Sequence, residues 1–276
     1  MSGFEIVKMS GSGNDFVVLD GVGRERLGAD VGAWVRRICR RGLSVGADGV
    51  LFVRPLGESA VEVEFRNPDG SLAFCANGTR CAARFAFRRG MAPRRMTLET
   101  AAGTIPAVVD EHAVRLELPV PVDSGTREVA VGDERVRGRL VDAGVPHFVI
   151  DDVDLPEGTL GRWGPVVRRA PVFGAQGTNV DLARRTGRRE LSVRTWERGV
   201  EGETLSCGSG AVASAFVAWL GGIGRSVRVV PPSGVPLEIE FDDAVGELRA
   251  VRLSGDARTV FVGQVDDESV SGFDAG

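Results

Sequence analysis

Two matching stretches decide the fold of this chain: Arg66-Asn67-Pro68-Asp69-Gly70-Ser71-Leu72-Ala73-Phe74-Cys75-Ala76-Asn77-Gly78 and Arg198-Gly199-Val200-Glu201-Gly202-Glu203-Thr204-Leu205-Ser206-Cys207-Gly208-Ser209-Gly210. In each, an Arg stands nine residues before a Cys, and a small residue, a polar residue and a Gly follow the Cys. A strand-like segment precedes each stretch, and an apolar segment follows it. Each copy therefore predicts a strand, a loop, a cysteine at a helix N-terminus and a helix.

The repeat occurs twice and is degenerate, which indicates a duplicated domain rather than a solenoid. A chain of 276 residues with 43% hydrophobic residues is long enough for two domains of ordinary size. The stretch 119–125, with two prolines followed by polar and Gly residues, is the predicted boundary. The expected domains are therefore residues 1–120 and 121–256.

Composition excludes several classes of protein. The net charge is −4 with mixed signs, so neither nucleic acid nor an anionic membrane is an expected partner. No apolar run approaches the roughly 18 residues of a membrane helix, and the N-terminus lacks the apolar core of a signal peptide. Four cysteines in a chain of this length favour free thiols and a cytoplasmic location over a disulfide scaffold.

Cofactors are not expected either. Lys8 is the only lysine, which disfavours pyridoxal phosphate because that cofactor needs a Schiff-base lysine. The chain has two histidines, His112 and His147, so a His-rich zinc site is excluded. We therefore expect no metal and no cofactor.

The two motif cysteines, Cys75 and Cys207, suit acid–base chemistry on carbon. A helix N-terminus offers unpaired backbone N–H groups and the positive end of the helix dipole, which bind an anion and lower the pKa of a thiol. Two thiols facing one small molecule could remove a proton from one face of a carbon and return one to the other. Cys39 and Cys81 lack the matched context and are expected to be ordinary core residues.

With both cysteines placed, the chain resembles diaminopimelate epimerases, within the cofactor-independent two-cysteine family that also contains proline racemase. The resemblance covers nearly the whole chain and rests on segments in the family's order: Met9–Phe16, Gly46–Gly49, Asn67–Ser71, Cys75–Cys81, Gly144–His147, Thr178–Val180, Glu197–Gly199 and Glu203–Gly210. Two departures stand out: Ala76 replaces the family's usual Gly, and Val145 replaces the Asn of many members.

The resemblance implies a role for each matching residue. Cys75 and Cys207 would be the catalytic acid and base, with His147 and Glu197 tuning the pKa values of the thiols. Backbone N–H groups would bind the reacting carboxylate, and further side chains would hold the rest of the substrate. The implied substrate-binding residues are Asn14, Asn67, Ala76, Asn77, Asn179, Glu197, Arg198, Gly208 and Ser209.

The expected fold class is α/β in the broad sense and α+β in the narrower one. It has two pseudo-symmetric domains, each a mixed, mostly antiparallel sheet wrapped around a central helix, with the active site in the cleft between them. The resemblance also implies that a strand at about 257–265 returns to the N-terminal domain. The reaction would interconvert LL- and meso-2,6-diaminopimelate, and a homodimer is left open. The alternatives are a related racemase of another amino acid and, from another class, a thiol redox or binding protein.

Overall fold

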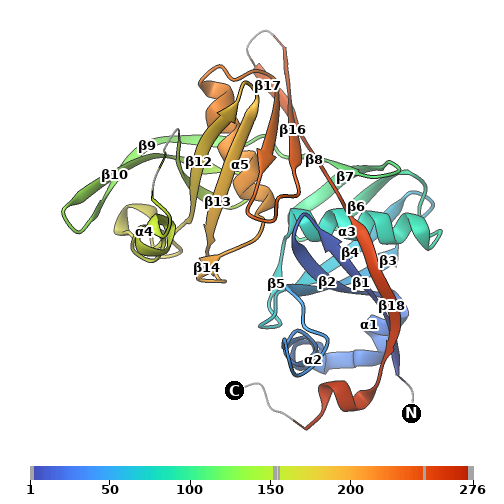
Figure 1. The fold of residues 1–276 in the computed structure, drawn as a ribbon. Helices are drawn as coiled ribbons and strands as arrows, with labels where there is room; N and C mark the ends of the chain where they lie inside the picture. Colours follow the sequence, from blue (N-terminus) through green and yellow to red (C-terminus); the bar gives the residue numbers. More distant parts are fainter. Residues whose placement is uncertain (1–2, 152–153, 155, 245–246, 273–276) are drawn as a thin grey trace. The chain divides into compact units, whose positions relative to one another are not determined.

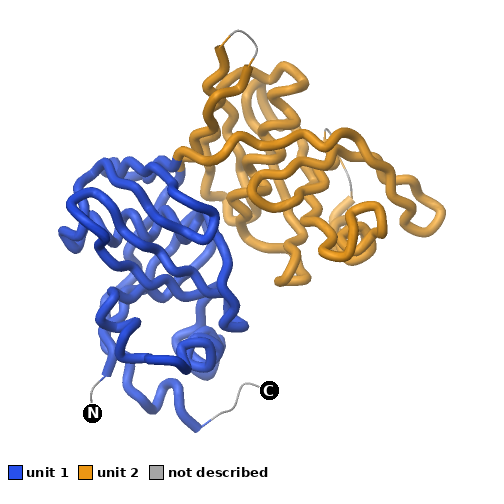
Figure 2. Tube along the Cα trace, turned by 180° about the vertical axis from the view of Figure 1, so that it is seen from behind, with its two compact units in different colours: residues 1–116, 255–276 blue, residues 117–254 orange. Residues whose placement is uncertain are grey.

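The computed structural model of the chain describes residues 3–151, 154, 156–244 and 247–272. The chain divides into two compact units, one formed by Met1–Leu116 with Gly255–Gly276 and the other by Glu117–Ser254 (Figure 2).

The first unit holds a mixed sheet. Its strands are β1 (Phe4–Gly11), β2 (Asn14–Asp20), β3 (Gly49–Pro55), β4 (Ala60–Arg66), β5 (Leu72–Ala73), β6 (Arg95–Thr100), β7 (Gly103–Val109), β8 (Val114–Leu118) and β18 (Arg258–Val265). They run in the order β18-β1-β2-β3-β4-β6-β7-β8, with β5 beside β4. The pairs β2–β3 and β4–β6 are parallel and the others are antiparallel. Its helices are α1 (Gly21–Leu27), η1 (Gly28–Asp30), α2 (Val31–Ile38), α3 (Ala76–Arg88) and η3 (Asp267–Val270).

The second unit repeats this plan. Its strands are β9 (Val122–Val131), β10 (Glu134–Asp142), β11 (Pro146–Ile150), β12 (Asn179–Gly187), β13 (Glu190–Glu197), β14 (Gly202–Glu203), β15 (Ser226–Val230), β16 (Leu237–Ala244) and β17 (Glu247–Gly255). They run in the order β9-β10-β11-β12-β13-β15-β16-β17, with β14 beside β13. The parallel pairs are β11–β12 and β13–β15. Its helices are α4 (Thr159–Arg168), η2 (Pro171–Phe173) and α5 (Gly208–Leu220).

The matching strand orders and matching parallel pairs confirm a mixed α+β fold built by duplication. Strands β1 to β8 correspond to β10 to β17, and β18 corresponds to β9. The chain reaches these two outer positions differently, because β9 leads directly into β10 while β18 arrives from the end of the chain. The boundary loop predicted at 119–125 is shorter in the structure, because strand β9 already begins at Val122.

Each sheet packs on one central helix. Helix α3 contacts strands β1 to β4, β6 and β7, and α5 contacts β10 to β13, β15 and β16 (Figure 1). Because the sheet curls around α5, small and apolar residues such as Val212, Ala213 and Phe216 are buried on several of its sides. Helix α3 is less uniform, since the buried side chains on it include Arg80 and Arg84.

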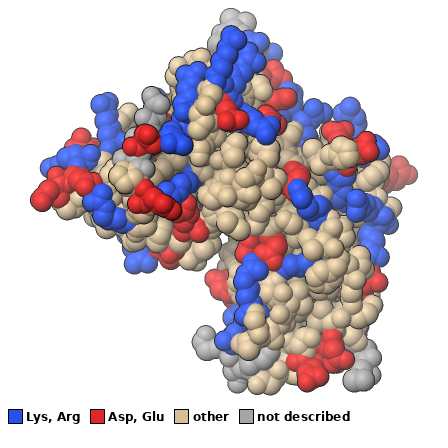
Figure 3. Space-filling model, viewed as in Figure 1, with Lys and Arg blue, Asp and Glu red and all other residues tan. Residues whose placement is uncertain are grey.

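On the face drawn in Figure 3, neither sign of charge dominates. Basic and acidic side chains are interspersed over the face seen in Figure 3. Within the described residues, no helix is both long and apolar enough to cross a membrane.

Candidate functional site: two cysteine half-sites

Both motif cysteines are N-cap residues. Cys75 caps α3 with φ −140° and ψ 112°, and Cys207 caps α5 with φ −123° and ψ 113°. The Sγ atom of Cys75 accepts a hydrogen bond from the Gly78 N–H at 3.4 Å, and that of Cys207 accepts one from the Gly210 N–H at 3.4 Å. Each sulfur therefore lies at the positive end of a helix dipole, where negative charge is stabilised.

The first half-site comprises Cys75, Ala76, Asn77, Gly78 and Asn14. Asn77 Nδ2 donates to Asn14 Oδ1 at 2.6 Å, and Asn14 Nδ2 donates to Asp48 Oδ2 at 3.0 Å. The β1–β2 turn approaches α3 so closely that a Cβ on Gly11 would lie 2.9 Å from the Asn77 carbonyl oxygen. Asn14 and Asn77 thus hold each other in place across this turn.

Ala76 fits its position without strain. Among the described residues, the non-glycine residues with positive φ are Ser12, at 54°, and Glu201, at 57°. Ala76 is the first residue of α3 and has ordinary helical geometry. Its methyl group therefore imposes no backbone penalty, although the family usually has Gly there.

A network of charged side chains, partly exposed at Arg41 and Asp48, holds Asn14 in place. Lys8 Nζ lies 2.5 Å from Asp15 Oδ2, Arg41 binds both Asp15 and Asp48, and Asp48 accepts from the amide of Asn14. Burial opposes ionisation of Asp15, but hydrogen bonds from Arg41 and Lys8 outweigh it and lower the pKa of this carboxyl. Asp48, which holds Asn14 directly, was not among the expected site residues.

We expect Asp15→Asn to destabilise the protein in a pH-dependent way. A lowered folded-state pKa contributes stability that is present above the unfolded value, about 4, and is lost as pH falls through the folded value. The stability difference between wild type and Asp15→Asn in urea unfolding should therefore shrink as pH falls below about 4. Glu62→Gln, which removes an exposed ion pair with Arg54, is the control. A difference that stays constant from pH 7 to pH 3 would contradict this role.

The second half-site comprises Cys207, Gly208, Ser209, His147 and Glu197. His147 is fully buried, and its Nδ1 lies 2.7 Å from Asp181 Oδ2. Its Nε2 lies 2.9 Å from Ser209 Oγ, which in turn lies 3.5 Å from Cys207 Sγ. These contacts connect the thiol to a buried carboxylate.

Glu197 lies on the other side of this thiol. Its Oε1 accepts from Thr204 Oγ1 at 2.7 Å, and desolvation raises the pKa of its carboxyl despite hydrogen bonds from Thr204 and Cys207. Glu197 is therefore a hydrogen-bonding neighbour of Cys207. Desolvation, followed by the charges of Glu197 and Asp181, raises the pKa of the Cys207 thiol well above its ordinary value. The lowered pKa expected from the helix dipole is therefore wrong for Cys207, because burial and the two carboxylates outweigh the dipole.

Asn179 has both ends of its amide engaged within the protein. Its Oδ1 accepts from the Arg198 backbone N–H at 2.8 Å, and its Nδ2 donates to the Pro146 carbonyl oxygen at 3.0 Å. Asn179 therefore joins the turn before His147 to the turn that carries Arg198.

Arg198 differs from the arginines around it. Arg194 binds Glu203 through two hydrogen bonds of 2.6 Å, and Arg168 Nε binds Glu201 at 2.6 Å. The guanidinium of Arg198 makes no hydrogen bond or ion pair within the described part of the chain. It is therefore available for an anionic ligand.

Asn67 is linked to neither half-site by a hydrogen bond within the described residues. Its Nδ2 donates to Ser71 Oγ at 3.1 Å, and its backbone closes the 67–71 turn. In this structure it is a turn residue on the loop that leads to Cys75.

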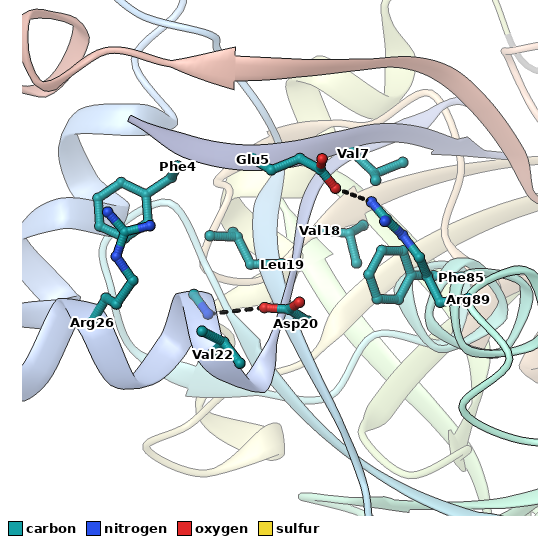
Figure 4. A pocket seen from close by; sticks show the side chains of 11 residues that line it. Phe4, Glu5, Val7, Val18, Leu19, Asp20, Val22, Arg26, Phe85 and Arg89 are labelled. Atoms are coloured by element: carbon teal, nitrogen blue, oxygen red, sulfur yellow. Dashed lines mark hydrogen bonds and ion pairs between the residues drawn. The ribbon is translucent and has the colours of Figure 1, made fainter. Parts of the chain in front are cut away.

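A separate cavity of about 150 Å³ lies on the first unit (Figure 4). Phe4 and Phe85 line it, the Arg26 guanidinium lies 4.4 Å from the centre of the Phe4 ring, and Arg89 pairs with Glu5 beside it. Its lining residues include no motif cysteine, histidine or asparagine. This cavity therefore belongs to neither half-site.

The sequence profile of the diaminopimelate epimerase family matches residues 6–133 and 139–260. The chain belongs to the diaminopimelate epimerase family. Relatives with high similarity carry that family's name. The diaminopimelate epimerase of Aquifex aeolicus (strain VF5) is 38% identical over 278 residues, covering 96% of this chain and 98% of the relative. That of Desulforudis audaxviator (strain MP104C) is 39% identical over 280 residues, covering 94% and 98%.

Solved structures share the fold of this family member at low sequence identity. A probable proline racemase from Agrobacterium radiobacter K84 superposes with a TM-score of 0.72 at 17% identity, covering 96% of this chain and 93% of that one. A hydroxyproline epimerase from Agrobacterium vitis gives a TM-score of 0.71 at 17% identity, covering 95% and 90%. The duplicated mixed fold is therefore common to this family and to related racemases and epimerases.

Asp181, like Asp48, is a residue beside the half-sites of this epimerase-family chain that sequence reasoning missed. It lies in the strand run Asn179-Val180-Asp181-Leu182 and is fully buried. A carboxylate inside an otherwise apolar strand was the available signal, because buried carboxylates need partners. Its partners are His147 and Thr195 Oγ1, which donates to Oδ1 at 2.6 Å.

A matched pair of glycine substitutions should separate the two half-sites. Gly210→Ala would place a Cβ 2.5 Å from Asp181 Oδ1, whereas Gly78→Ala would meet Leu51 Cδ2 at 3.3 Å. Because hydrogen bonds hold Asp181 in position, we expect Gly210→Ala to lower the free energy of unfolding by about 1–3 kcal/mol. Gly78→Ala should be close to neutral, since better helix propensity offsets mild crowding. Urea unfolding of both variants checks this, and equal effects would count against a rigid Asp181.

Proposed function

We propose that this chain interconverts LL- and meso-2,6-diaminopimelate by a two-base mechanism without a cofactor. Membership of the diaminopimelate epimerase family supports the reaction class, an isomerisation at the α-carbon of an amino acid. The observation that carries the mechanism is the matched pair of helix-capping cysteines, each accepting from a backbone N–H.

In the proposed mechanism, one cysteine acts as thiolate and removes the α-proton while the other donates a proton to the opposite face. Backbone N–H groups of Ala76, Asn77, Gly208 and Ser209 bind the α-carboxylate and stabilise the carbanion-like transition state. His147 and Glu197 set the protonation of the thiols.

The guanidinium of Arg198, which has no partner in the described ranges of the chain, supports a substrate with two carboxylates. Planar guanidinium forms two parallel hydrogen bonds to a carboxylate, which suits the distal end of diaminopimelate. Asn179 holds the Arg198 backbone in position, and we assign Asn14 and Asn67 to the same distal contacts. Val145 supplies no polar contact, so Arg198 carries more of the recognition here.

Deuterium exchange at the α-carbon tests the proposal most directly. The purified chain is incubated in D₂O with each diaminopimelate isomer and with amino acids that have a single α-carboxylate, and exchange is followed by proton NMR. We expect exchange with the LL and meso isomers and little with the others. Exchange restricted to another amino acid would favour a related racemase, and no exchange with any substrate would favour a thiol redox or binding protein.

We also propose that the chain forms a homodimer through the free edge of β18. Val260, Phe261 and Val262 on this strand are exposed by 58%, 46% and 58%, and β1 is its strand partner within the described residues. Residues 259–265 include no charged side chain, although exposed edge strands normally carry charge or proline against aggregation. A second copy pairing along this edge would cover it.

Sedimentation velocity tests the dimer. We expect wild type to sediment as a dimer and Phe261→Glu as a monomer, because a buried unpaired carboxylate is costly. Val22→Glu, at an apolar residue of α1 that is 65% exposed, is the control and should remain dimeric. A monomeric wild type would overturn this proposal. We further place the enzyme in the cytoplasm, where free catalytic thiols stay reduced.

A further inference from the structure

We propose that Asp181 is a positioning residue and that Ser209 relays protons between Cys207 and His147, so that the second half-site contains its own proton path. The proposal rests on the proposed function in assuming that Cys207 exchanges protons during turnover. It adds Asp181 to the machinery of that reaction and gives the hydroxyl of Ser209 a role besides that of its backbone N–H.

The contacts define one tautomer of His147. Asp181 Oδ2, which faces Nδ1 of His147, can only accept a hydrogen bond. Asn179 Nδ2, which lies 3.4 Å from Nε2 of His147, can only donate one. The orientation of the Asn179 amide is fixed independently, because Oδ1 accepts from a backbone N–H and Nδ2 donates to a carbonyl oxygen. The neutral ring therefore carries its proton on Nδ1, and Nε2 is an acceptor facing Ser209.

The hydroxyl of Ser209 connects this acceptor to the thiol. With Nε2 as acceptor, Ser209 Oγ donates to His147 at 2.9 Å and is left to accept from the Cys207 S–H at 3.5 Å. The proton of Cys207 can then pass to Ser209 as the Ser209 proton passes to Nε2. The products are a Cys207 thiolate and a His147 imidazolium, which the Asp181 carboxylate stabilises, and the reverse transfer restores the thiol.

The first unit shows that the fold does not require this polar cluster. In the paired strands, Phe16 lies opposite Gly49 as His147 lies opposite Asn179, and Leu51 lies opposite Phe65 as Asp181 lies opposite Thr195. The cap glycines agree with this equivalence: Gly78 faces Leu51 and Phe16, and Gly210 faces Asp181 and Thr195. One copy of the duplicated domain thus has Phe16, Leu51 and Phe65 where the other has His147, Asp181 and Thr195.

A buried polar triad in place of a packed apolar one is costly in stability unless it has another use. The chemistry of Cys207 supplies that use. Glu197 from β13 and Asp181 from β12 both oppose loss of its proton, and desolvation raises the pKa of the thiol well above its ordinary value. A two-base enzyme must nevertheless return each thiol to its starting protonation state after every turnover. An internal base reached through Ser209 allows this without admitting water to the site.

Histidine NMR tests the positioning role separately from activity. The chain has two histidines, and His112 is exposed, with 88% of its side chain accessible, so it serves as an internal reference. In ¹⁵N-histidine-labelled wild type we expect His147 to carry its proton on Nδ1. Asp181→Asn should shift the tautomer toward Nε2–H, as loss of the orienting carboxylate does in other Asp–His pairs. A wild-type Nε2–H tautomer, or an unchanged tautomer in Asp181→Asn, would overturn the role of Asp181.

If Asp181→Asn does not fold, Thr195→Val tests the same point. It removes the hydrogen bond to Oδ1 and keeps the charge. We then expect the His147 Nδ1 proton signal to move while the His112 signals stay unchanged. An unmoved signal would count against a positioned carboxylate.

Thiol alkylation tests the relay. Iodoacetamide labelling at pH 7, read by peptide mass spectrometry, reports the thiolate fraction at Cys75 and Cys207 separately. We expect Ser209→Ala to slow labelling of Cys207 by about tenfold or more, the effect of about one pKa unit, and to leave Cys75 unchanged. Ser214→Ala is the control, because Ser214 is a buried serine of the same helix whose hydroxyl has no hydrogen-bond partner in the described structure.

The outcomes separate this inference from the proposed function. Equal Cys207 labelling in wild type and Ser209→Ala overturns the relay even in an enzyme that epimerises diaminopimelate. The expected tautomer and labelling pattern in a protein that exchanges no α-proton would uphold the proton path and remove the substrate assignment.

Discussion

Alanine at either Cys75 or Cys207 is expected to lower the rate of diaminopimelate epimerisation by ~10²–10⁴-fold, the usual effect of losing a positioned acid or base. Neither thiol can replace the other, because one removes a proton from one face of the carbon and the other delivers one to the opposite face. The effect should appear in kcat with thermal stability nearly unchanged, since each cysteine is only partly buried at a helix cap. Steady-state kinetics with both isomers and thermal unfolding measure the two quantities.

Cys39→Ala is the matched control for these variants. Cys39 is buried in the core of the first unit, and desolvation raises the pKa of its thiol to about 12, so it cannot serve as a base near neutral pH. The Cys39→Ala variant should have a lower free energy of unfolding, because the substitution leaves a small cavity, and should keep the wild-type turnover. Wild-type turnover in Cys75→Ala or Cys207→Ala would end the two-thiol mechanism.

Arg198→Met is expected to lower kcat/KM for diaminopimelate by roughly 10–150-fold, the equivalent of about 1.5–3 kcal/mol for a lost charge-assisted hydrogen bond. Arg198→Lys should recover only part of this, because an ammonium group cannot make the paired contacts of a planar guanidinium. Stability should hardly change, since the side chain makes no bond within the described part of the protein. Kinetics and thermal unfolding on the same samples separate recognition from folding.

Arg194→Lys is the control for Arg198. Arg194 lies on β13, the strand that ends one residue before Arg198, but its guanidinium is bound to Glu203, so its replacement should leave kcat/KM unchanged. An unchanged kcat/KM in Arg198→Met would remove the main reason for preferring a substrate with two carboxylates.

Sequence alone was sufficient for the features that depend on neighbours in the chain. The duplication, the two capping cysteines and the helices that follow them are local signals, because a cap is decided by the residues within one helical turn of it. Cys75 and Cys207 are indeed the N-caps of α3 and α5. The short helix α1 was missed because its Gly residues and lack of buried side chains give no periodic signal.

The pairing of distant strands decided the rest. Asp181 meets His147 and Thr195 only because β12 lies between β11 and β13 in one particular register. The equivalent ladder of the first unit brings Phe16, Leu51 and Phe65 together. The carboxylate of Asp181 in an apolar strand is a local signal, but no local pattern identifies its partners, because register depends on contacts between residues far apart in sequence. For the same reason, only the tertiary structure shows that the amide of Asn179 is occupied, while the guanidinium of Arg198 makes no bond among the residues that the structure describes.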